Sequence, residues 1–224
     1  MKSKPIIIVP GEPNSIFFEI FFKSLKNNKF KSPIILVSSR KLFERQAKYF
    51  KSKIKFNEIN YSKKKIGKIY SNSINLINVN YSQKKVFEKI SGKSNTYIKN
   101  CFTIALDLLN KKISNKLING PISKKFLLKK NYAGITEYLA KKTNTKNVSM
   151  IIYNKSLSVS PVTTHLPISF IPKKITKLEI INKIKIINSF WQKHFKFKPK
   201  IAVTGLNPHC ESIDKFNEDE EAVK

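Results

Sequence analysis

The strongest restriction on the fold of this chain comes from short apolar runs that alternate with helical patterns. Residues 6–9 form an uninterrupted β-branched run that ends at a Pro-Gly-Glu-Pro loop, which is typical of a buried strand. Apolar residues then recur at helical spacing, which predicts a helix from about Ser15 to Lys26. The same pair of patterns follows, with a strand at 34–37, a helix at 41–50 and a strand at 54–56. Strands separated by helices predict an α/β fold with a mostly parallel sheet.

The pattern weakens over residues 60–95, which are rich in lysine and serine, and we expect a solvated excursion there with one strand at 74–79. Periodicity then returns. The remaining elements are predicted in this order: a helix at 96–112, a strand from Lys116 into a Gly-Pro turn and a further helix, a helix at 136–142, strands at 148–153 and 157–162, a helix at 177–194, and a strand at 200–203.

The formal charge of +30 first suggests an anionic partner, such as nucleic acid, an acidic membrane surface or a phosphorylated small molecule. Only Arg40 and Arg45 are arginines, however, and the planar arginine fork is the group that suits bidentate contacts to phosphates and bases. An excess of lysine without arginine is more typical of a composition bias across a genome. We therefore predict no specific nucleic-acid partner.

The two cysteines, Cys101 and Cys210, cannot build the disulfide framework of a small secreted domain, and no CxxC pair suggests zinc. The apolar run at 6–9 is shorter than the roughly 7–15 residues of a signal-peptide core. The most apolar stretch, 16–22, contains Glu19 and is far below the roughly 20 residues that span a bilayer. These features predict a cytoplasmic protein without a membrane partner.

Two of the three histidines directly follow apolar runs, in loops marked by proline: His165 in TTHLP and His209 in GLNPH. Functional groups collect at the carboxyl ends of strands in open α/β sheets, and a catalytic metal needs about three protein ligands, most often histidines. Taken alone, two histidines so far apart in sequence favour a structural role, such as capping a turn or filling a pocket. The third, His194, is predicted to lie on the surface of the long helix.

Five short segments, in order along the chain, carry a resemblance to a known family. They are Pro10-Gly11-Glu12-Pro13, Asn119-Gly120-Pro121-Ile122-Ser123-Lys124, Ala133-Gly134-Ile135-Thr136-Glu137-Tyr138-Leu139, Thr163-Thr164-His165-Leu166-Pro167 and Gly205-Leu206-Asn207-Pro208-His209. In that order they resemble the PGEP loop, the TGPxxK turn, the GHTE(F/Y)L segment and the TTHLP and GLNPH motifs of the 4-hydroxythreonine-4-phosphate dehydrogenase (PdxA) family. Each is weak alone, but five in register are specific.

The resemblance implies an isocitrate/isopropylmalate-dehydrogenase-like two-domain α/β fold. The first domain is expected at 1–125, and the second, with the candidate metal histidines, at 126–224. A homodimer with its active site at the subunit interface and a phosphorylated small-molecule substrate are implied as well. The family continues well past residue 224, so we expect a fold that is incomplete at its C-terminus and lacks the third metal histidine. A chain with two ligands should bind zinc weakly, and a full-length version tightly.

The implied activity is NAD-dependent oxidative decarboxylation of 4-phosphooxy-L-threonine in pyridoxal 5'-phosphate biosynthesis, with a divalent metal (Zn, Mg or Co). Carried over residue by residue, His165 and His209 are candidate metal ligands, and Thr136 and Ile135 occupy the substrate-binding positions. Lys124 is the candidate catalytic lysine, a compact cation able to meet the substrate phosphate or move a proton. The metal would acidify the substrate hydroxyl and then hold electron density as carbon dioxide leaves. The residues that bind NAD are not predicted.

The chain departs from the family pattern at several positions. Ile135 stands where the family has a histidine, and the loss of one hydrogen bond to a charged group costs about 1.5–3 kcal/mol. Glycines after the PGEP and GLNPH motifs are also replaced, which removes backbone freedom. Two alternatives stay open: a related metal-dependent dehydrogenase of altered substrate, and an inactive truncated protein or non-catalytic binding protein that holds nucleic acid through its positive surface.

Overall fold

The computed structural model describes residues 3–27, 30–71, 73–129 and 131–206. The chain divides into two compact units, Met1–Lys129 and Lys130–Lys224. The sequence placed a domain boundary slightly earlier, at 125/126. Each unit is described by itself below.

The first unit is built on a five-stranded sheet in the order β3-β4-β2-β1-β5, and all neighbouring strands are parallel. The strands are β1 (Ile6–Val9), β2 (Ile34–Ser38), β3 (Phe56–Glu58), β4 (Ile74–Asn78) and β5 (Leu117–Asn119). In the register of the central strand, Ile8 pairs with Leu36 on one side and with Ile118 on the other. A parallel sheet needs cover on both faces, which explains why β1 and β2 are almost wholly apolar.

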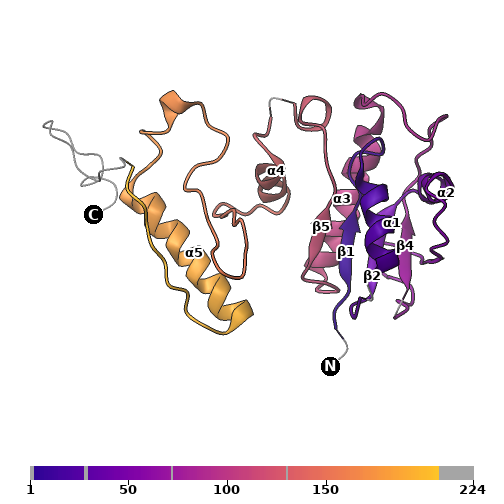
Figure 1. The fold of residues 1–224 in the computed structure, drawn as a ribbon, viewed down its shortest axis with the longest axis horizontal. Helices are drawn as coiled ribbons and strands as arrows, with labels where there is room; N and C mark the ends of the chain where they lie inside the picture. Colours follow the sequence, from indigo (N-terminus) through magenta and orange to yellow (C-terminus); the bar gives the residue numbers. More distant parts are fainter. Residues whose placement is uncertain (1–2, 28–29, 72, 130, 207–224) are drawn as a thin grey trace, which may run out of the picture. The chain divides into compact units, whose positions relative to one another are not determined.

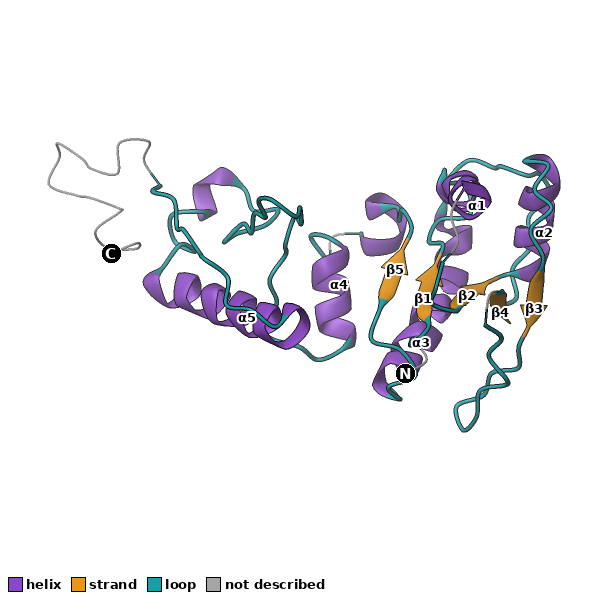
Figure 2. Cartoon of the chain, turned by 60° about the horizontal axis from the view of Figure 1, so that its bottom comes forward, coloured by secondary structure: helices purple, strands orange, loops and turns teal. Residues whose placement is uncertain are grey.

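Three helices supply that cover: α1 (Phe17–Asn27), α2 (Arg40–Tyr49) and α3 (Asn95–Asn110). Right-handed crossovers that move toward β4 place α1 and α2 on one face, and the crossover that returns to β5 places α3 on the other. Figures 1 and 2 show this arrangement, with the sheet between α3 and the α1/α2 pair. The mostly parallel α/β fold predicted from the alternation is therefore confirmed for this unit.

The core of the first unit has an aromatic layer under α1 and α2 and a second apolar layer under α3. Phe18, Phe22 and Phe43 pack edge to face or tilted, with ring centroids 5.3–5.9 Å apart. On the opposite side, Phe102 and Leu108 are fully buried. Burial of one such side chain contributes roughly 1.5–3 kcal/mol, so these layers hold the helices against the sheet.

The excursion over residues 60–95 is less solvated than predicted. The Tyr81 ring stacks on Tyr97 of α3 at 4.7 Å, and Phe87 packs against Phe50 at 6.1 Å. Gln83 is buried, and its amide donates hydrogen bonds to Asn14 and to the Val86 carbonyl. The high lysine content of this segment predicted exposure to solvent, but its aromatic side chains bury apolar area against the rest of the unit.

The second unit contains α4 (Ile135–Lys142), the 3-10 turn η3 (Ile168–Phe170) and the long helix α5 (Lys177–Phe195). The two longer helices agree with the prediction. The strands predicted at 148–153, 157–162 and 200–203 are wrong for the described residues: a single bridge joins Ile152 to Val159, and 201–205 is irregular. A strand needs partners for its backbone N–H and C=O groups along its length, and beyond this one bridge no strand pairing joins the described parts of these segments.

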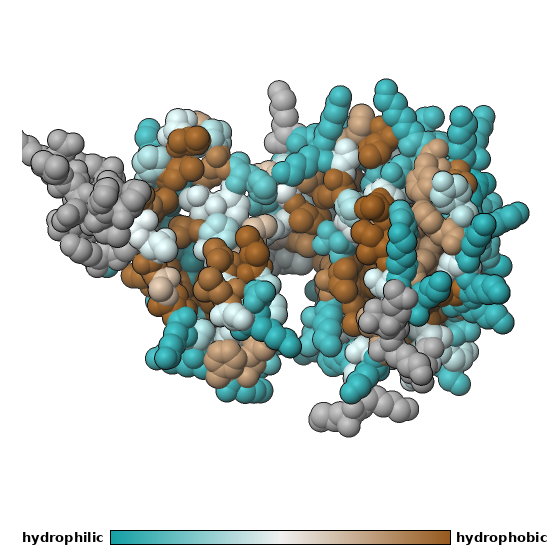
Figure 3. All heavy atoms as spheres, viewed as in Figure 1, coloured by the Kyte–Doolittle hydropathy of each residue, from teal (hydrophilic) through white to brown (hydrophobic). Residues whose placement is uncertain are grey.

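Many apolar side chains of the second unit reach the surface. Figure 3 shows them around α5, and they include Leu157, Ile168 and Leu178, which are 74%, 85% and 67% exposed. None of the helices in the described ranges combines the length and the apolar content that a membrane crossing requires.

Candidate functional site

The loops that follow β1 and β5 meet at the carboxyl edge of the sheet through two glycines. The Glu12 N–H donates to the Pro121 carbonyl at 2.8 Å, and Gly11 has a left-handed φ of +79°. A Cβ on Gly11 would lie 2.2 Å from the Pro121 oxygen, and one on Gly120 would lie 1.9 Å from the Pro10 oxygen. Real Cβ atoms do not approach so closely, so both positions require glycine. The PGEP and NGP motifs are thus two halves of one interlocked backbone contact.

Glu12 fixes the first of these loops from inside the unit. Its side chain is 3% exposed, and it accepts hydrogen bonds from the Ser94 hydroxyl at 2.9 Å and from the Asn14 side-chain amide at 3.2 Å. Asn14 in turn accepts from the Glu88 N–H at 2.7 Å. A buried carboxylate needs such donors to offset the loss of water. The sequence marked this loop as a motif but gave no role to Glu12, because Ser94, which donates to its carboxylate, lies 82 positions downstream.

Lys124 lies directly after this contact, at the start of the π-helical turn η2 (Lys124–Leu128). The Ser123 hydroxyl accepts from the Phe126 N–H at 3.2 Å and starts the turn. Leu127 and Leu128 anchor the turn in the core, while the Lys124 side chain is exposed. The candidate lysine is therefore carried by a fixed backbone and is free to reach an anion.

The first turn of α4 carries the two predicted substrate-binding positions. Gly134 is the N-cap residue, and Ile135 and Thr136 are half-buried. Glu137, also in this turn, accepts a hydrogen bond from the Thr164 hydroxyl at 2.9 Å through its Oε1 atom. That bond ties α4 to the TTHLP loop, 27 residues further along the chain.

The TTHLP loop places His165 against the same helix end. His165 is exposed and has a φ of 54°, a left-handed conformation that costs roughly 1–3 kcal/mol in a residue with a side chain. A Cβ on Gly134 would lie 3.2 Å from the His165 Nε2 atom and 3.0 Å from Glu137 Oε2. Within the described residues, Oε2 is buried and has no hydrogen-bond partner.

Imidazole nitrogen is a ligand that Zn²⁺ accepts, so His165 is a candidate metal ligand on chemical grounds. The ranges that the structure describes contain no group of three or more His, Cys, Asp or Glu side chains able to hold a metal. His209, the other predicted ligand, lies outside the described residues. His194 is exposed on α5, as predicted, and packs against Phe190 at 4.6 Å.

A pocket of about 460 Å³ lies in the second unit, between α5 and the irregular segments before and after it. Its aromatic lining includes Tyr153, Trp191 and Phe195, and Tyr153 stacks on Phe195 at 5.8 Å. Of the predicted site residues that the structure describes, none lines this pocket. Its lining mixes these rings with polar side chains such as Ser158 and Lys200.

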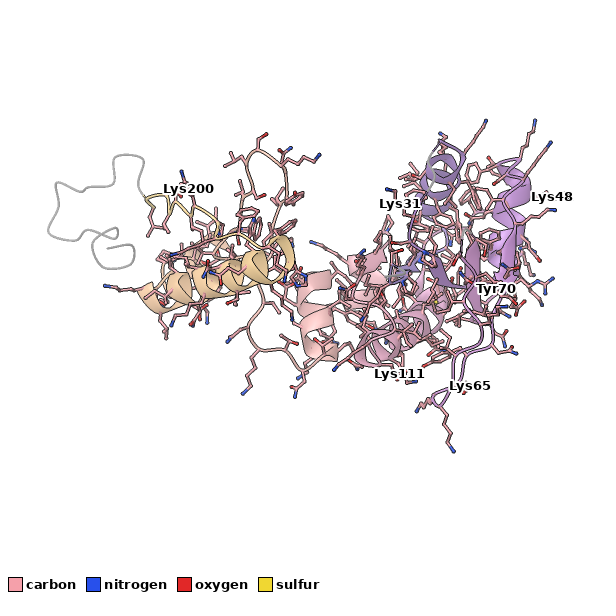
Figure 4. The ribbon with its side chains drawn as sticks, turned by 90° about the horizontal axis from the view of Figure 1, so that it is seen from below. Lys31, Lys48, Lys65, Tyr70, Lys111 and Lys200 are labelled. Carbon is pink, nitrogen blue, oxygen red and sulfur yellow. The ribbon has the colours of Figure 1, made fainter. Side chains whose placement is uncertain are left out.

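The positive charge is dispersed and not gathered at either site. Figure 4 labels exposed lysines from separate segments, among them Lys31, Lys48, Lys65 and Lys200. One of the two arginines, Arg40, pairs with Glu44 at 2.8 Å and with Glu58 at 3.1 Å.

Comparisons with known proteins agree with the motifs. The family model "Pyridoxal phosphate biosynthetic protein PdxA" matches residues 29–224. A 4-hydroxythreonine-4-phosphate dehydrogenase from Sulfurihydrogenibium sp. is 34% identical over 222 residues, which cover 97% of this chain and 67% of the relative. A protein from Oceanobacillus iheyensis with the provisional name D-threonate 4-phosphate dehydrogenase is 27% identical over 229 residues, 100% of this chain and 69% of the relative.

Solved structures give the same result for the fold. The 4-hydroxythreonine-4-phosphate dehydrogenase of Klebsiella pneumoniae superimposes with a TM-score of 0.77 and 25% identity, over 92% of this chain and 65% of that one. The corresponding structure from Burkholderia phymatum gives a TM-score of 0.78 at 22% identity, over 98% and 68%. The chain thus spans about two thirds of the length of these proteins. With the family model matched over most of its residues, the chain belongs to the PdxA family of pyridoxal phosphate biosynthetic proteins.

Proposed function

We propose that the protein oxidises and decarboxylates 4-phosphooxy-L-threonine with NAD and a divalent metal, as a step of pyridoxal phosphate biosynthesis in the cytoplasm. The observation that carries the proposal is the juxtaposition, in a member of this family, of His165 with the first turn of α4. The metal would lower the pKa of the substrate hydroxyl and hold electron density during decarboxylation, and NAD would accept the hydride.

The residues of this chain would bind and orient the substrate. His165 would hold the metal through its exposed imidazole, together with His209. Thr136 would offer its hydroxyl to the substrate, and Ile135 would present an apolar surface beside it. Lys124 would meet the phosphate as a point charge, which its exposure at the start of η2 permits.

We further propose that the active form is a homodimer. The support is the number of large apolar side chains that the second unit leaves exposed, such as Leu157 and Ile168. Exposed apolar patches of this kind commonly mark protein interfaces. Sedimentation analysis over a range of protein concentrations tests this proposal, and a monomer at every concentration contradicts it.

A second substrate class has a specific observation in its favour. Ile135 removes a hydrogen-bonding group from the substrate-binding turn, and one relative is named for D-threonate 4-phosphate. A site that lacks one polar partner should favour a substrate that does not need it, because an unpaired polar group costs about 1–3 kcal/mol on burial. A related phosphorylated hydroxy acid is therefore the rival substrate.

The test is an assay of the protein encoded by the complete gene with both phosphorylated acids, NAD and Mg²⁺ or Zn²⁺. NADH and carbon dioxide should form in equal amounts with 4-phosphooxy-L-threonine. His165→Ala should lower kcat/KM roughly 100-fold or more, since a metal ligand is lost, and His194→Ala should leave it unchanged. Preference for D-threonate 4-phosphate would select the rival. Wild-type activity in His165→Ala would overturn the metal role.

A further inference from the structure

A side chain from α3 holds the π-helical turn η2, which begins at Lys124. The Asn95 side-chain amide donates a hydrogen bond through its Nδ2 atom to the Phe126 carbonyl at 2.9 Å. Within the turn, the Lys129 N–H donates to the Lys124 carbonyl at 2.8 Å, which is the spacing of a π turn. Asn95 lies 31 positions before Phe126, so the fold and not the local sequence brings the two together.

The backbone geometry of η2 needs support from its surroundings. π turns are rare and occur frequently at functional sites. Lys129, which ends the turn, has a left-handed φ of 53°, a conformation that a residue with a side chain keeps only where its surroundings determine it. Leu127 and Leu128 anchor the end of the turn in the core, while its start at Lys124 is exposed. Phe126 lies between the two parts, so the bond from Asn95 fixes the backbone close to the exposed start.

The start of α3 provides a fixed base for that bond. Asn95 is the first residue of α3, and the residue before it, Ser94, is 2% exposed and donates to the buried Glu12 carboxylate at 2.9 Å. Two consecutive side chains thus hold the loop after β1 and the turn after β5. Both segments follow the carboxyl ends of their strands, where α/β folds place their functional groups.

The oxygen of the Asn95 amide shows that this side chain adds little to stability. The Oδ1 atom is buried and has no hydrogen-bond partner among the residues that the structure describes. A buried acceptor without a donor costs at least about as much as one neutral hydrogen bond contributes, so the two effects offset each other. The bond to Phe126 is therefore better explained by what it positions than by the stability it adds.

We propose that Asn95 is a positioning residue for Lys124: by holding the Phe126 carbonyl, it keeps η2 in the π-helical form that presents the lysine at its exposed start. This rests on the proposed contact between Lys124 and the substrate phosphate. The attraction between two charges falls as the distance between them grows, so the lysine must be presented at a fixed place. Loss of the hydrogen bond should weaken substrate binding and leave the chemical step unchanged.

The first test measures the kinetics of the protein encoded by the complete gene with 4-phosphooxy-L-threonine. Lys124→Ala should raise KM about 10-fold or more. Asn95→Ala should raise KM about 3- to 10-fold with kcat within about twofold of the wild type, since binding common to the ground state and the transition state is lost. In the double variant, Asn95→Ala should add nothing, because both residues act through one contact. The matched control, Asn100→Ala at an exposed position of α3, should leave KM unchanged.

The second test needs no substrate. Amide hydrogen exchange of the 224-residue chain is followed by NMR at Leu127 and Lys129, whose N–H groups donate to the carbonyls of Ser123 and Lys124. Asn95→Ala should speed exchange at both amides about 10-fold, because the turn opens more often. Amides at the centre of α3 and the thermal midpoint should stay close to the wild type. Asn100→Ala should alter none of these quantities.

The two tests separate the positioning role from the proposed function. If the protein does not oxidise the substrate, the proposed function fails, and hydrogen exchange alone decides whether Asn95 holds η2. If Lys124→Ala leaves KM unchanged in an active enzyme, the phosphate contact and the positioning role both fall, while the oxidation stands. The positioning role is also overturned if exchange at Leu127 and Lys129 is unchanged in Asn95→Ala, or if Asn95→Ala changes KM equally with and without Lys124.

Discussion

At the scale of single residues, the backbone contact between the β1 and β5 loops depends on the absence of one Cβ. In Gly120→Ala, the new methyl group would stand 1.9 Å from the Pro10 oxygen and 2.5 Å from the Phe17 ring. Both neighbours are held, one by the backbone and the other by packing against Phe18 and Phe21. We expect the free energy of unfolding, measured by urea denaturation, to fall by about 1–3 kcal/mol.

The matched control for this prediction is Gly92→Ala. A Cβ there would meet only the Asn95 side-chain nitrogen, at 3.5 Å, an ordinary contact. The change in unfolding free energy should stay within about 0.5 kcal/mol. Equal effects of the two substitutions would show that the interlock of the loops does not require glycine.

At the scale of elements, a hydrogen bond from Tyr61 connects the turn at 60–66 to α3. The Tyr61 hydroxyl donates to Asp107 Oδ2 at 2.7 Å, and Asp107 also pairs with Lys111. Burial, followed by the hydrogen bond to Asp107 and the charge of its carboxylate, raises the pKa of Tyr61 to about 12. The folded state therefore favours the neutral phenol.

The sign of the pH effect follows from that shift. An unfolded tyrosine loses its proton near pH 10, and the folded one near 12, so this stabilisation is complete below pH 10 and is lost between about 10 and 12. Tyr61→Phe should cost about 1 kcal/mol at neutral pH. Because phenylalanine has no proton to lose, the mutant should lack this alkaline loss, and the difference between the two stability curves should shrink between about pH 10 and 12. Tyr70→Phe, an exposed control, should change neither. Parallel curves for wild type and Tyr61→Phe up to pH 12 would contradict the assignment.

The elements also show why some parts of the fold follow from the sequence and others do not. Helical periodicity is local, so α3 and α5 were predicted within a few residues of their bounds. A strand depends on a partner elsewhere in the chain. The apolar runs at 34–37 and 148–153 look alike in sequence, yet the first pairs with two strands and the second makes one bridge.

One residue of the candidate site could likewise be predicted from the sequence, and another could not. His165 was predicted from its motif, and the structure places it in the expected loop. Its neighbour Glu137 was not predicted, because the hydrogen bond to Thr164 joins two segments that only the fold brings together. The signal was present in the Gly-Ile-Thr-Glu segment, where the acid stands next to the residue assigned to the substrate.

At the scale of the whole molecule, the core of the first unit is closed within residues 1–129. Its five strands pair with one another, and its helices cover both faces of the sheet. The second unit differs, because its longest helix buries only Ile180 and Trp191. Stability in a cooperative domain follows the apolar area removed from water, so most of it should come from the first unit.

We therefore expect residues 1–129 to fold alone. The fragment should show helical and strand signals in circular dichroism, dispersed amide resonances and one cooperative urea transition, with a midpoint close to the main transition of the whole chain. The denaturant dependence should match a unit of this size, because it scales with the surface exposed on unfolding. Gly120→Ala provides the internal check: it should lower the stability of the fragment and of the whole chain by the same amount, as its contacts lie wholly within the first unit. A fragment that stays unfolded, or whose response to Gly120→Ala differs from that of the whole chain, would show that residues after 129 are needed to complete the core.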